Sequence, residues 1–245
     1  MSITSRNTSS ARIQLRALGR AIPALRSGWY LVLELKSMVG TTPERQREHF
    51  EKLFAGRTDP WQYRLDAQQH RFQRELRMIL AAGNGGRFCS ALEIGCAEGA
   101  FTGLLAEHCD YLLAVDFSAT ALTRARLRAV WPKTVQFHEL DIVRDPLPHP
   151  FDLIVVTDVL DDLALPWRLQ ALRRKLVAAL GPGGLLMVGN PRANSVIENS
   201  WWGRRLVRGG MWISHFISRD PGLELLTQTT TATRVDSLFR RRLPN

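Results

Sequence analysis

Short apolar runs alternate with amphipathic stretches along most of this 245-residue chain. Runs rich in Val, Leu, Ile and Phe predict strands at 88–94, 111–115, 135–140, 152–157 and 185–189. Apolar positions at helical spacing predict helices at 101–108, 119–130 and 166–180. This alternation predicts an α/β fold, a mostly parallel sheet with helices on both faces and right-handed crossovers. Two later runs, 223–230 and 234–240, predict a closing hairpin.

Turn and cap signals mark the boundaries of these elements. Thr42-Pro43-Glu44 is typical of a helix start, with a Thr cap and Pro at the first helical position, and predicts a helix to about residue 54. A second helix is predicted at 66–82. Ser118 is placed to cap the helix that follows it, and Gly181-Pro-Gly-Gly184 predicts a turn before the fifth strand.

These signals divide the chain into three parts. We expect a basic extension, flexible or helical, at 1–40, an N-terminal helical cap at 41–86, and the sheet domain at 87–245, in which 190–219 is an insert. The net charge is +10, and residues 1–33 hold five arginines and no acid. Such an arm is most simply solvated, so we expect at most weak contact with a membrane surface and no specific nucleic-acid partner.

Length and cysteine content further limit the kind of protein that this sequence can be. A chain of 245 residues can bury one sizeable core, which suits one α/β domain with an appendage. No apolar run approaches the roughly 20 residues that span a bilayer. The three cysteines have no paired metal-binding spacing. We therefore expect a cytoplasmic protein without a metal site.

The turn after the first strand has the composition of a ligand-binding loop. Glycines at Gly95 and Gly99 allow a ligand to lie against the backbone. The loop lacks the Gly-x-Gly-x-x-Gly spacing of dinucleotide sites, and its two acids, Glu93 and Glu98, would repel a diphosphate. A zwitterionic amino acid with a sulfonium fits better, and the predicted contacts are Glu93, Gly95, Ala97 and Gly99.

Acids also end the next two strands. Asp116 is placed to accept both hydroxyls of a ribose, and Phe117 to lie beside an adenine. Asp141 could accept from the adenine amino group, while Ile142 offers its backbone N–H to a ring nitrogen. Three acids that end three successive strands favour S-adenosylmethionine as the cofactor, and thus a methyltransferase.

The whole set of motifs over 88–189 resembles the class I S-adenosylmethionine-dependent methyltransferases. The matching segments are Glu-Ile-Gly-Cys-Ala-Glu-Gly, Leu-Leu-Ala-Val-Asp-Phe-Ser, Glu-Leu-Asp, Phe-Asp-Leu-Ile-Val-Val-Thr-Asp-Val-Leu and Gly-Pro-Gly-Gly. The resemblance implies a Rossmann-like, seven-stranded, mostly parallel sheet with an antiparallel last strand. It also places the insert on the side of the methyl acceptor.

A narrower resemblance covers about 50–180. Asp59-Pro-Trp61-Gln-Tyr63, a basic helix, and then Ala-Leu-Glu-Ile-Gly-Cys-Ala-Glu-Gly-Ala-Phe-Thr are similar to the rhizobial nodulation N-methyltransferases. Those enzymes methylate the free amine of a deacetylated chito-oligosaccharide, so the resemblance implies a small-molecule acceptor, best an amine-bearing saccharide or related metabolite. An aromatic pair often follows the fourth strand in that family, where this chain has Asp161-Asp162.

Two residues are candidates for handling the proton of an amine acceptor. Asp158 follows the fourth strand, and His215 lies in the insert. Asp158 could equally contact the cofactor or its loop, and His215 could be a buried, hydrogen-bonded core residue. Trp61 and Tyr63 could form a lid over the methyl donor, or simply pack the cap against the domain.

Other functions stay open at this point. An O-methyltransferase of a lipid or secondary metabolite uses the same donor chemistry. A methyltransferase of RNA or protein is supported only by the basic extension. A non-enzymatic binding module would be free to lose the acids that end the strands.

Overall fold

The computed structural model describes residues 43–83, 85–148, 150–161, 163, 166–192 and 209–243. The predicted extension at 1–40 and the central part of the predicted insert, 193–208, lie outside these residues. Residues 43–245 form one compact unit. The predicted helical cap and the sheet domain are therefore parts of the same unit.

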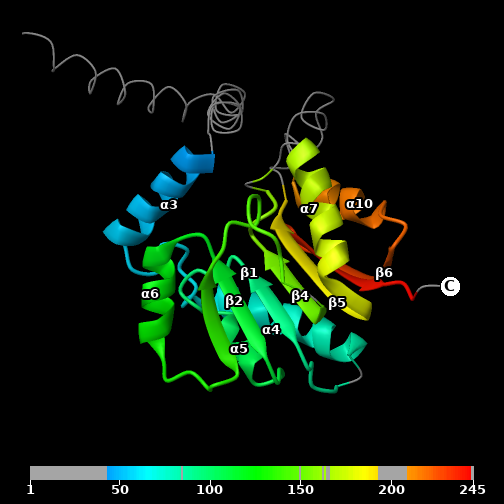
Figure 1. Ribbon diagram of the computed structural model, residues 1–245, viewed down its shortest axis with the longest axis horizontal. Helices are drawn as coiled ribbons and strands as arrows, with labels where there is room; N and C mark the ends of the chain where they lie inside the picture. Colours follow the sequence, from blue (N-terminus) through cyan, green and yellow to red (C-terminus); the bar gives the residue numbers. More distant parts are fainter. Residues whose placement is uncertain are drawn as a thin grey trace, which may run out of the picture. The chain divides into compact units, whose positions relative to one another are not determined.

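A seven-stranded sheet forms the centre of this unit, in the order β3-β2-β1-β4-β5-β7-β6 (Figure 1). The strands are β1 Ala91–Ile94, β2 Leu112–Asp116, β3 Val135–Glu139, β4 Phe151–Thr157, β5 Leu180–Pro191, β6 Leu223–Thr230 and β7 Arg234–Arg241. Strands β1 to β5 are parallel, and β7 is antiparallel to both β5 and β6. The predicted topology, with its reversed last strand, is confirmed.

Helices cover both faces of the sheet (Figure 1). They are α3 Pro43–Gly56, α4 Asp66–Ala82, α5 Thr102–Ala106, α6 Ala119–Arg128, α7 Pro166–Ala179 and α10 Gly210–Ser218. Side chains alternate across a strand, so each strand supplies two cores. Leu92 and Ile94 pack with apolar residues of α7 and α10, whereas Ala91 and Leu112 pack with those of α4 and α5.

Local signals place most boundaries well. The predicted helix at 66–82 is α4 itself, Asp66–Ala82, and its side chains Phe72, Leu76 and Ile79 are buried as the periodicity predicts. The Ser118 hydroxyl accepts the N–H of Ala121 at 3.1 Å and caps α6. Side-chain acceptors of this kind satisfy backbone donors that a first helical turn leaves without a partner.

The glycine-rich segment before the fifth strand differs from the prediction. Residues 181–184 do not form a separate turn but lie within β5. The pairing of β4 with β5 moves from Phe151–Leu180 to Leu153–Leu185, so the extra residues form a bulge. Gly183 has φ +75°, a left-handed conformation that glycine adopts at little cost.

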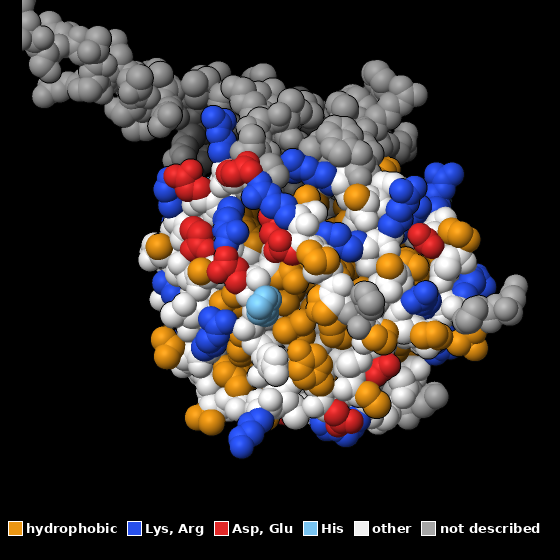
Figure 2. Space-filling model, viewed as in Figure 1, with side chains coloured by type: hydrophobic (Ala, Val, Ile, Leu, Met, Phe, Trp, Pro, Cys, Tyr) orange, Lys and Arg blue, Asp and Glu red, His pale blue; other side chains and the backbone are white. Residues whose placement is uncertain are grey.

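The surface carries charges of both signs. On the face shown in Figure 2, Lys and Arg side chains are interspersed with Asp and Glu rather than gathered into one field. Within the described ranges, no helix combines the length and the apolar character needed to cross a bilayer.

Candidate active site

A cavity of about 340 Å³ lies at the carboxyl ends of the parallel strands. Ligands of open α/β sheets bind at this edge. Helix α3 and the segment before α4 supply its opposite wall, which we call the roof and define by Phe50, Phe54, Trp61 and Tyr63. Seven of the predicted site residues line the cavity: Gly95, Ala97, Asp116, Phe117, Asp141, Ile142 and Asp158.

Asp116 ends β2 with its carboxylate held by the backbone. Its Oδ2 accepts the N–H of Ala97 and its Oδ1 accepts that of Ser118, both at 2.9 Å. Burial raises the pKa of Asp116 to about 6, although these backbone donors act to lower it. Each carboxylate oxygen has a second lone pair, so the side chain can still accept from two hydroxyls of a ligand.

The glycine loop between β1 and α5 is left-handed at three positions. Gly95, Ala97 and Gly99 have φ of +75°, +48° and +76°. A Cβ on Gly95 would lie 2.3 Å from Cγ2 of Val159, so only glycine fits there. Ala97 adopts a conformation that glycine reaches more easily. A Cβ on Gly99 would meet Trp131 at 3.1 Å, which makes Gly99 a packing position, and it does not line the cavity.

Glu93 is not where the sequence analysis expected it. The side chain is 4% exposed, accepts the hydroxyl hydrogen of Thr102 at 2.6 Å, and does not line the cavity. Burial raises the pKa of Glu93 to about 7. Its hydrogen bond with Thr102 joins the end of β1 to the first residue of α5.

The predicted adenine end has an aromatic wall and an anchored acid. The ring of Phe117 meets Phe50 of α3 edge to face, with centroids 5.4 Å apart. Oδ1 of Asp141 accepts the N–H of Val143 at 2.9 Å, and the backbone N–H of Asp141 donates to Asp145 at 2.8 Å. The loop after β3 is thereby held in one shape beside the cavity.

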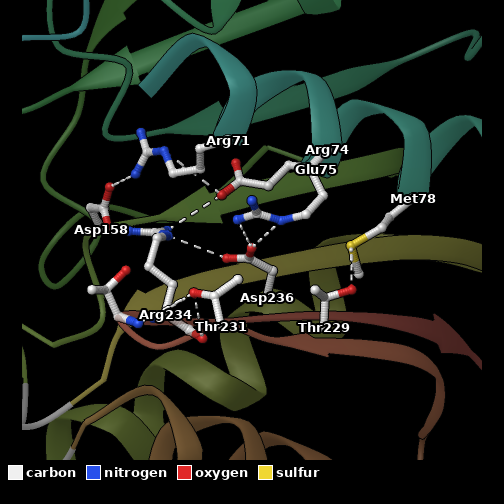
Figure 3. A network of polar contacts seen from close by, with 10 residues as sticks. Arg71, Arg74, Glu75, Met78, Asp158, Thr229, Thr231, Arg234 and Asp236 are labelled. Carbon is white, nitrogen blue, oxygen red and sulfur yellow. Dashed lines mark hydrogen bonds and ion pairs between the residues drawn. The ribbon is translucent and has the colours of Figure 1, made fainter. Parts of the chain in front are cut away.

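Asp158 lies between two arginines (Figure 3). Its Oδ2 accepts from Arg71 of α4 and its Oδ1 accepts from Arg234 of β7. All three residues line the cavity, and Asp158 has φ +57°. Because each carboxylate oxygen already receives a guanidinium hydrogen, Asp158 is better suited to orient the arginines than to take a proton from an acceptor.

A second set of charges lies behind this trio (Figure 3). Arg234 contacts Glu75 at 3.3 Å and Asp236 at 3.4 Å, and Arg74 contacts Asp236 at 2.6 Å. The side chains of Glu75 and Asp236 are fully buried. Burial raises the pKa of Glu75 to about 8, although Arg71 and Arg234 act to lower it.

His215 does not reach the cavity. It lies on α10, is exposed, and is absent from the cavity lining. Neither the expected proton acceptor nor the alternative, a buried core histidine, matches this position. The residues that α10 buries are Gly210, Ile213, Ser214 and Ile217, so the helix turns His215 toward solvent.

Trp61 and Tyr63 both belong to the roof. Trp61 is 40% exposed, and its ring lies 5.9 Å from that of Phe50. Tyr63 packs against Phe72 of α4 at 5.5 Å, and burial raises the pKa of its hydroxyl above the usual value. Tyr63 also belongs to the apolar cluster of Phe50 and Phe54 on α3, so it both lines the cavity and packs α3 and α4 together.

The sequence analysis missed the two arginines of the cavity lining that bind Asp158. Arg71 falls on the apolar stripe of α4, next to Phe72 and one turn before Glu75. A charged pair on the buried face of an amphipathic helix is a usable signal. Arg234 gave no comparable local signal. In the described part of the chain, no cluster of His, Cys, Asp and Glu is suited to a metal ion.

The strand order and the acids around one cavity define a Rossmann-like methyltransferase fold. The family model for Nodulation protein S (NodS) matches residues 42–211, and the chain belongs to this family.

Nodulation protein S of Bradyrhizobium diazoefficiens is 40% identical over 134 residues, which are 55% of this chain and 63% of that protein. The protein of the same name from Rhizobium tropici is 37% identical over 134 residues, which are 55% and 56% of the two chains. The chain therefore matches less than two thirds of either relative. The crystal structure of N-methyltransferase NodS from Bradyrhizobium japonicum WM9, in complex with S-adenosyl-L-homocysteine, is 28% identical with a TM-score of 0.67. That alignment covers 80% of this chain and 97% of the other.

Proposed function

We propose that this protein is an S-adenosylmethionine-dependent N-methyltransferase. Membership of the NodS family supports the proposal, as does the S-adenosyl-L-homocysteine bound to the NodS of Bradyrhizobium japonicum WM9. The observation that carries it is the placement of Asp116. Its buried carboxylate faces the cavity at the tip of β2, beside the backbone of Ala97.

The proposed donor runs along the cavity from the loop after β3 to α4. Asp116 accepts the ribose hydroxyls, while Phe117, Asp141 and Ile142 surround the adenine. The amino-acid part then lies beside the backbone of Gly95, which lines the cavity together with Val159.

Arg71 is the residue that we assign to the donor's carboxylate. Its side chain is 4% exposed, lines the cavity, and lies over the ring of Phe72 at 4.3 Å. Its Nη1 donates to Asp158, and in Figure 3 its other terminal nitrogen points away from that contact. A guanidinium fixed in this way loses little side-chain entropy when it binds an anion.

Methyl transfer is an in-line displacement at the sulfonium carbon, with a neutral leaving group. The protein's contribution is alignment of the acceptor and exclusion of water. The described lining of the cavity contains no histidine. We therefore assign most of the rate enhancement of methyl transfer to alignment of donor and acceptor beneath the roof. In this mechanism the acceptor amine binds in its unprotonated form.

The proposed acceptor is an amine-bearing saccharide, of the chito-oligosaccharide type that the family resemblance implies. Asp161 and Arg168 line the cavity beyond Asp158 and provide polar groups for hydroxyls. The charges of both signs in Figure 2 suit a small neutral or zwitterionic partner better than nucleic acid. Three free cysteines suit a reducing cytoplasm as the place of action.

Calorimetric titration with S-adenosylhomocysteine and with NAD tests the class of ligand. We expect binding of the former alone; binding of NAD alone would contradict the proposal. Mass spectrometry then tests the acceptor, with a chito-oligosaccharide that carries one free amine and a fully N-acetylated control. Transfer of one methyl group to the free-amine oligosaccharide alone is expected. Equal methylation of the acetylated control would show O-methylation instead.

A further inference from the structure

The turn that carries Trp61 and Tyr63 is built around Asp59. The carboxylate of Asp59 accepts the N–H of Tyr63 at 2.8 Å and that of Arg64 at 3.1 Å. Asp59 and Gln62 have φ of +50° and +56°. Residues other than glycine keep this left-handed conformation only where their surroundings impose it. The shape of the roof therefore depends on contacts from outside the turn.

Glu98 of the glycine loop supplies such a contact. Glu98 is 5% exposed, and the two oxygens of its carboxylate accept the backbone N–H of Asp59 at 3.1 and 3.3 Å. Arg124 of α6 donates to the same carboxylate at 2.9 Å, and also to the carbonyl oxygen of Arg57. Glu98 and Arg124 together hold the turn at two positions, 57 and 59.

Glu98 follows directly after a residue of the cavity lining, so its contact with Asp59 connects the cavity to the roof. Glu98 itself does not line the cavity, whereas the residue before it, Ala97, does and is hydrogen-bonded to Asp116. A displacement of the glycine loop is therefore passed through one residue to Asp59, and from Asp59 to the backbone of Tyr63. The free-energy cost of burying the Glu98 carboxylate is offset only while its hydrogen-bond donors stay in place. The contact with Asp59 is therefore sensitive to such a displacement.

We propose that Glu98 is a positioning residue that couples the cofactor loop to the roof. The loop that holds the methyl donor also fixes Trp61 and Tyr63 above it, so that donor binding orders the roof before the acceptor reacts. The identity of the ligand rests on the proposed function, whereas the hold of Glu98 on the turn does not.

Hydrogen exchange read by mass spectrometry tests this coupling in the full chain. In Glu98→Ala, without ligand, we expect the amides of residues 57–65 to exchange about tenfold faster than in the unmodified protein, and those of β4 to exchange at the same rate. S-adenosylhomocysteine should slow exchange in 57–65 of the unmodified protein. It should still bind Glu98→Ala, but without protecting this segment.

Two further variants make the result specific. Arg124→Ala leaves the Glu98 carboxylate in place and should give a smaller increase, confined to 57–65. Asp110→Ala removes an exposed ion pair with Arg87 and should leave exchange in 57–65 unchanged. If Glu98→Ala exchanges faster throughout the sheet, that variant is destabilised as a whole. Exchange of residues 57–65 in Arg124→Ala then decides whether the Glu98–Arg124 pair holds the turn.

Unchanged exchange of 57–65 in both Glu98→Ala and Arg124→Ala would overturn the proposal. Equal protection by S-adenosylhomocysteine in the unmodified protein and in Glu98→Ala would overturn the coupling. If the unmodified protein failed to bind S-adenosylhomocysteine, the proposed function would fail. The ligand-free comparison would still decide whether Glu98 holds the turn.

Discussion

At the scale of single residues, the acids at the ends of three successive strands have three different surroundings. Glu93 contacts Thr102, Asp116 accepts two backbone N–H groups at the cavity, and Asp141 accepts from Val143. The sequence could place these acids near strand ends, because strand ends are marked locally. It could not show that Glu93 lies outside the cavity lining, because that depends on which face of the sheet its side chain takes.

The burial of Glu93 predicts a pH dependence of stability. Its pKa rises from an ordinary 4.5 to about 7 on folding, so the folded protein holds the proton more tightly than the unfolded chain. Stability from this group is therefore greatest below about pH 4.5, falls as the pH rises to about 7, and is constant above. Urea denaturation between pH 5 and 8 should show Glu93→Gln gaining about 2–3 kcal/mol over the unmodified protein across this window.

Asp116 contributes a slope of the same sign, since its pKa is also raised, to about 6. The unmodified protein and Glu93→Gln both retain Asp116, so the difference between their stabilities excludes the pH dependence that Asp116 contributes. Denaturation curves that stay parallel for the two proteins at every pH would contradict the assignment of Glu93.

At the scale of secondary-structure elements, ion pairs join α4 to β7 and to Asp158, the residue that follows β4. The network links Arg71 and Glu75 of α4 with Arg234 of β7. Arg71 and Glu75 could be predicted as buried, because they fall on the apolar stripe of α4. Arg234 lies 76 positions after Asp158, and the antiparallel insertion of β7 between β5 and β6 is what brings the two together. Contacts that depend on the order of strands in the sheet cannot be predicted from a short segment of the sequence.

The network predicts a difference between two substitutions of the same type. Arg234→Met leaves the buried acids Glu75 and Asp236 short of a partner and should cost about 3–5 kcal/mol. Arg87→Met removes an exposed pair with Asp110, in which both side chains are more than half exposed, and should cost less than about 1 kcal/mol. Urea denaturation measures both values, and similar small costs would show that the network contributes little.

At the scale of the whole molecule, one sheet edge and one helical roof enclose the site. Residues 43–245 form a compact unit that contains every described residue of the cavity. The alternation of strands and helices, the hairpin and the cap helices were predictable from periodicity. The enclosure was not, because the distance between the roof and the glycine loop is set by tertiary contacts such as that of Glu98 with Asp59.

This division of the chain predicts the effect of truncation. A chain that begins at Thr41 should keep its melting temperature, and its affinity for S-adenosylhomocysteine should stay within about twofold. It loses the five arginines of residues 1–33, so any binding to anionic vesicles at low salt should fall. Vesicle sedimentation and calorimetry check the two parts. A large loss of cofactor affinity on truncation would show that the extension belongs to the site.

The central claim is that Asp116 accepts the ribose hydroxyls of an adenosyl cofactor, and titration of one variant tests it most directly. Asp116→Ala should bind S-adenosylhomocysteine at least about 100-fold more weakly than the unmodified protein, because two charge-assisted hydrogen bonds are lost. Asp110→Ala should bind it as the unmodified protein does. Undiminished affinity in a folded Asp116→Ala protein would contradict the account.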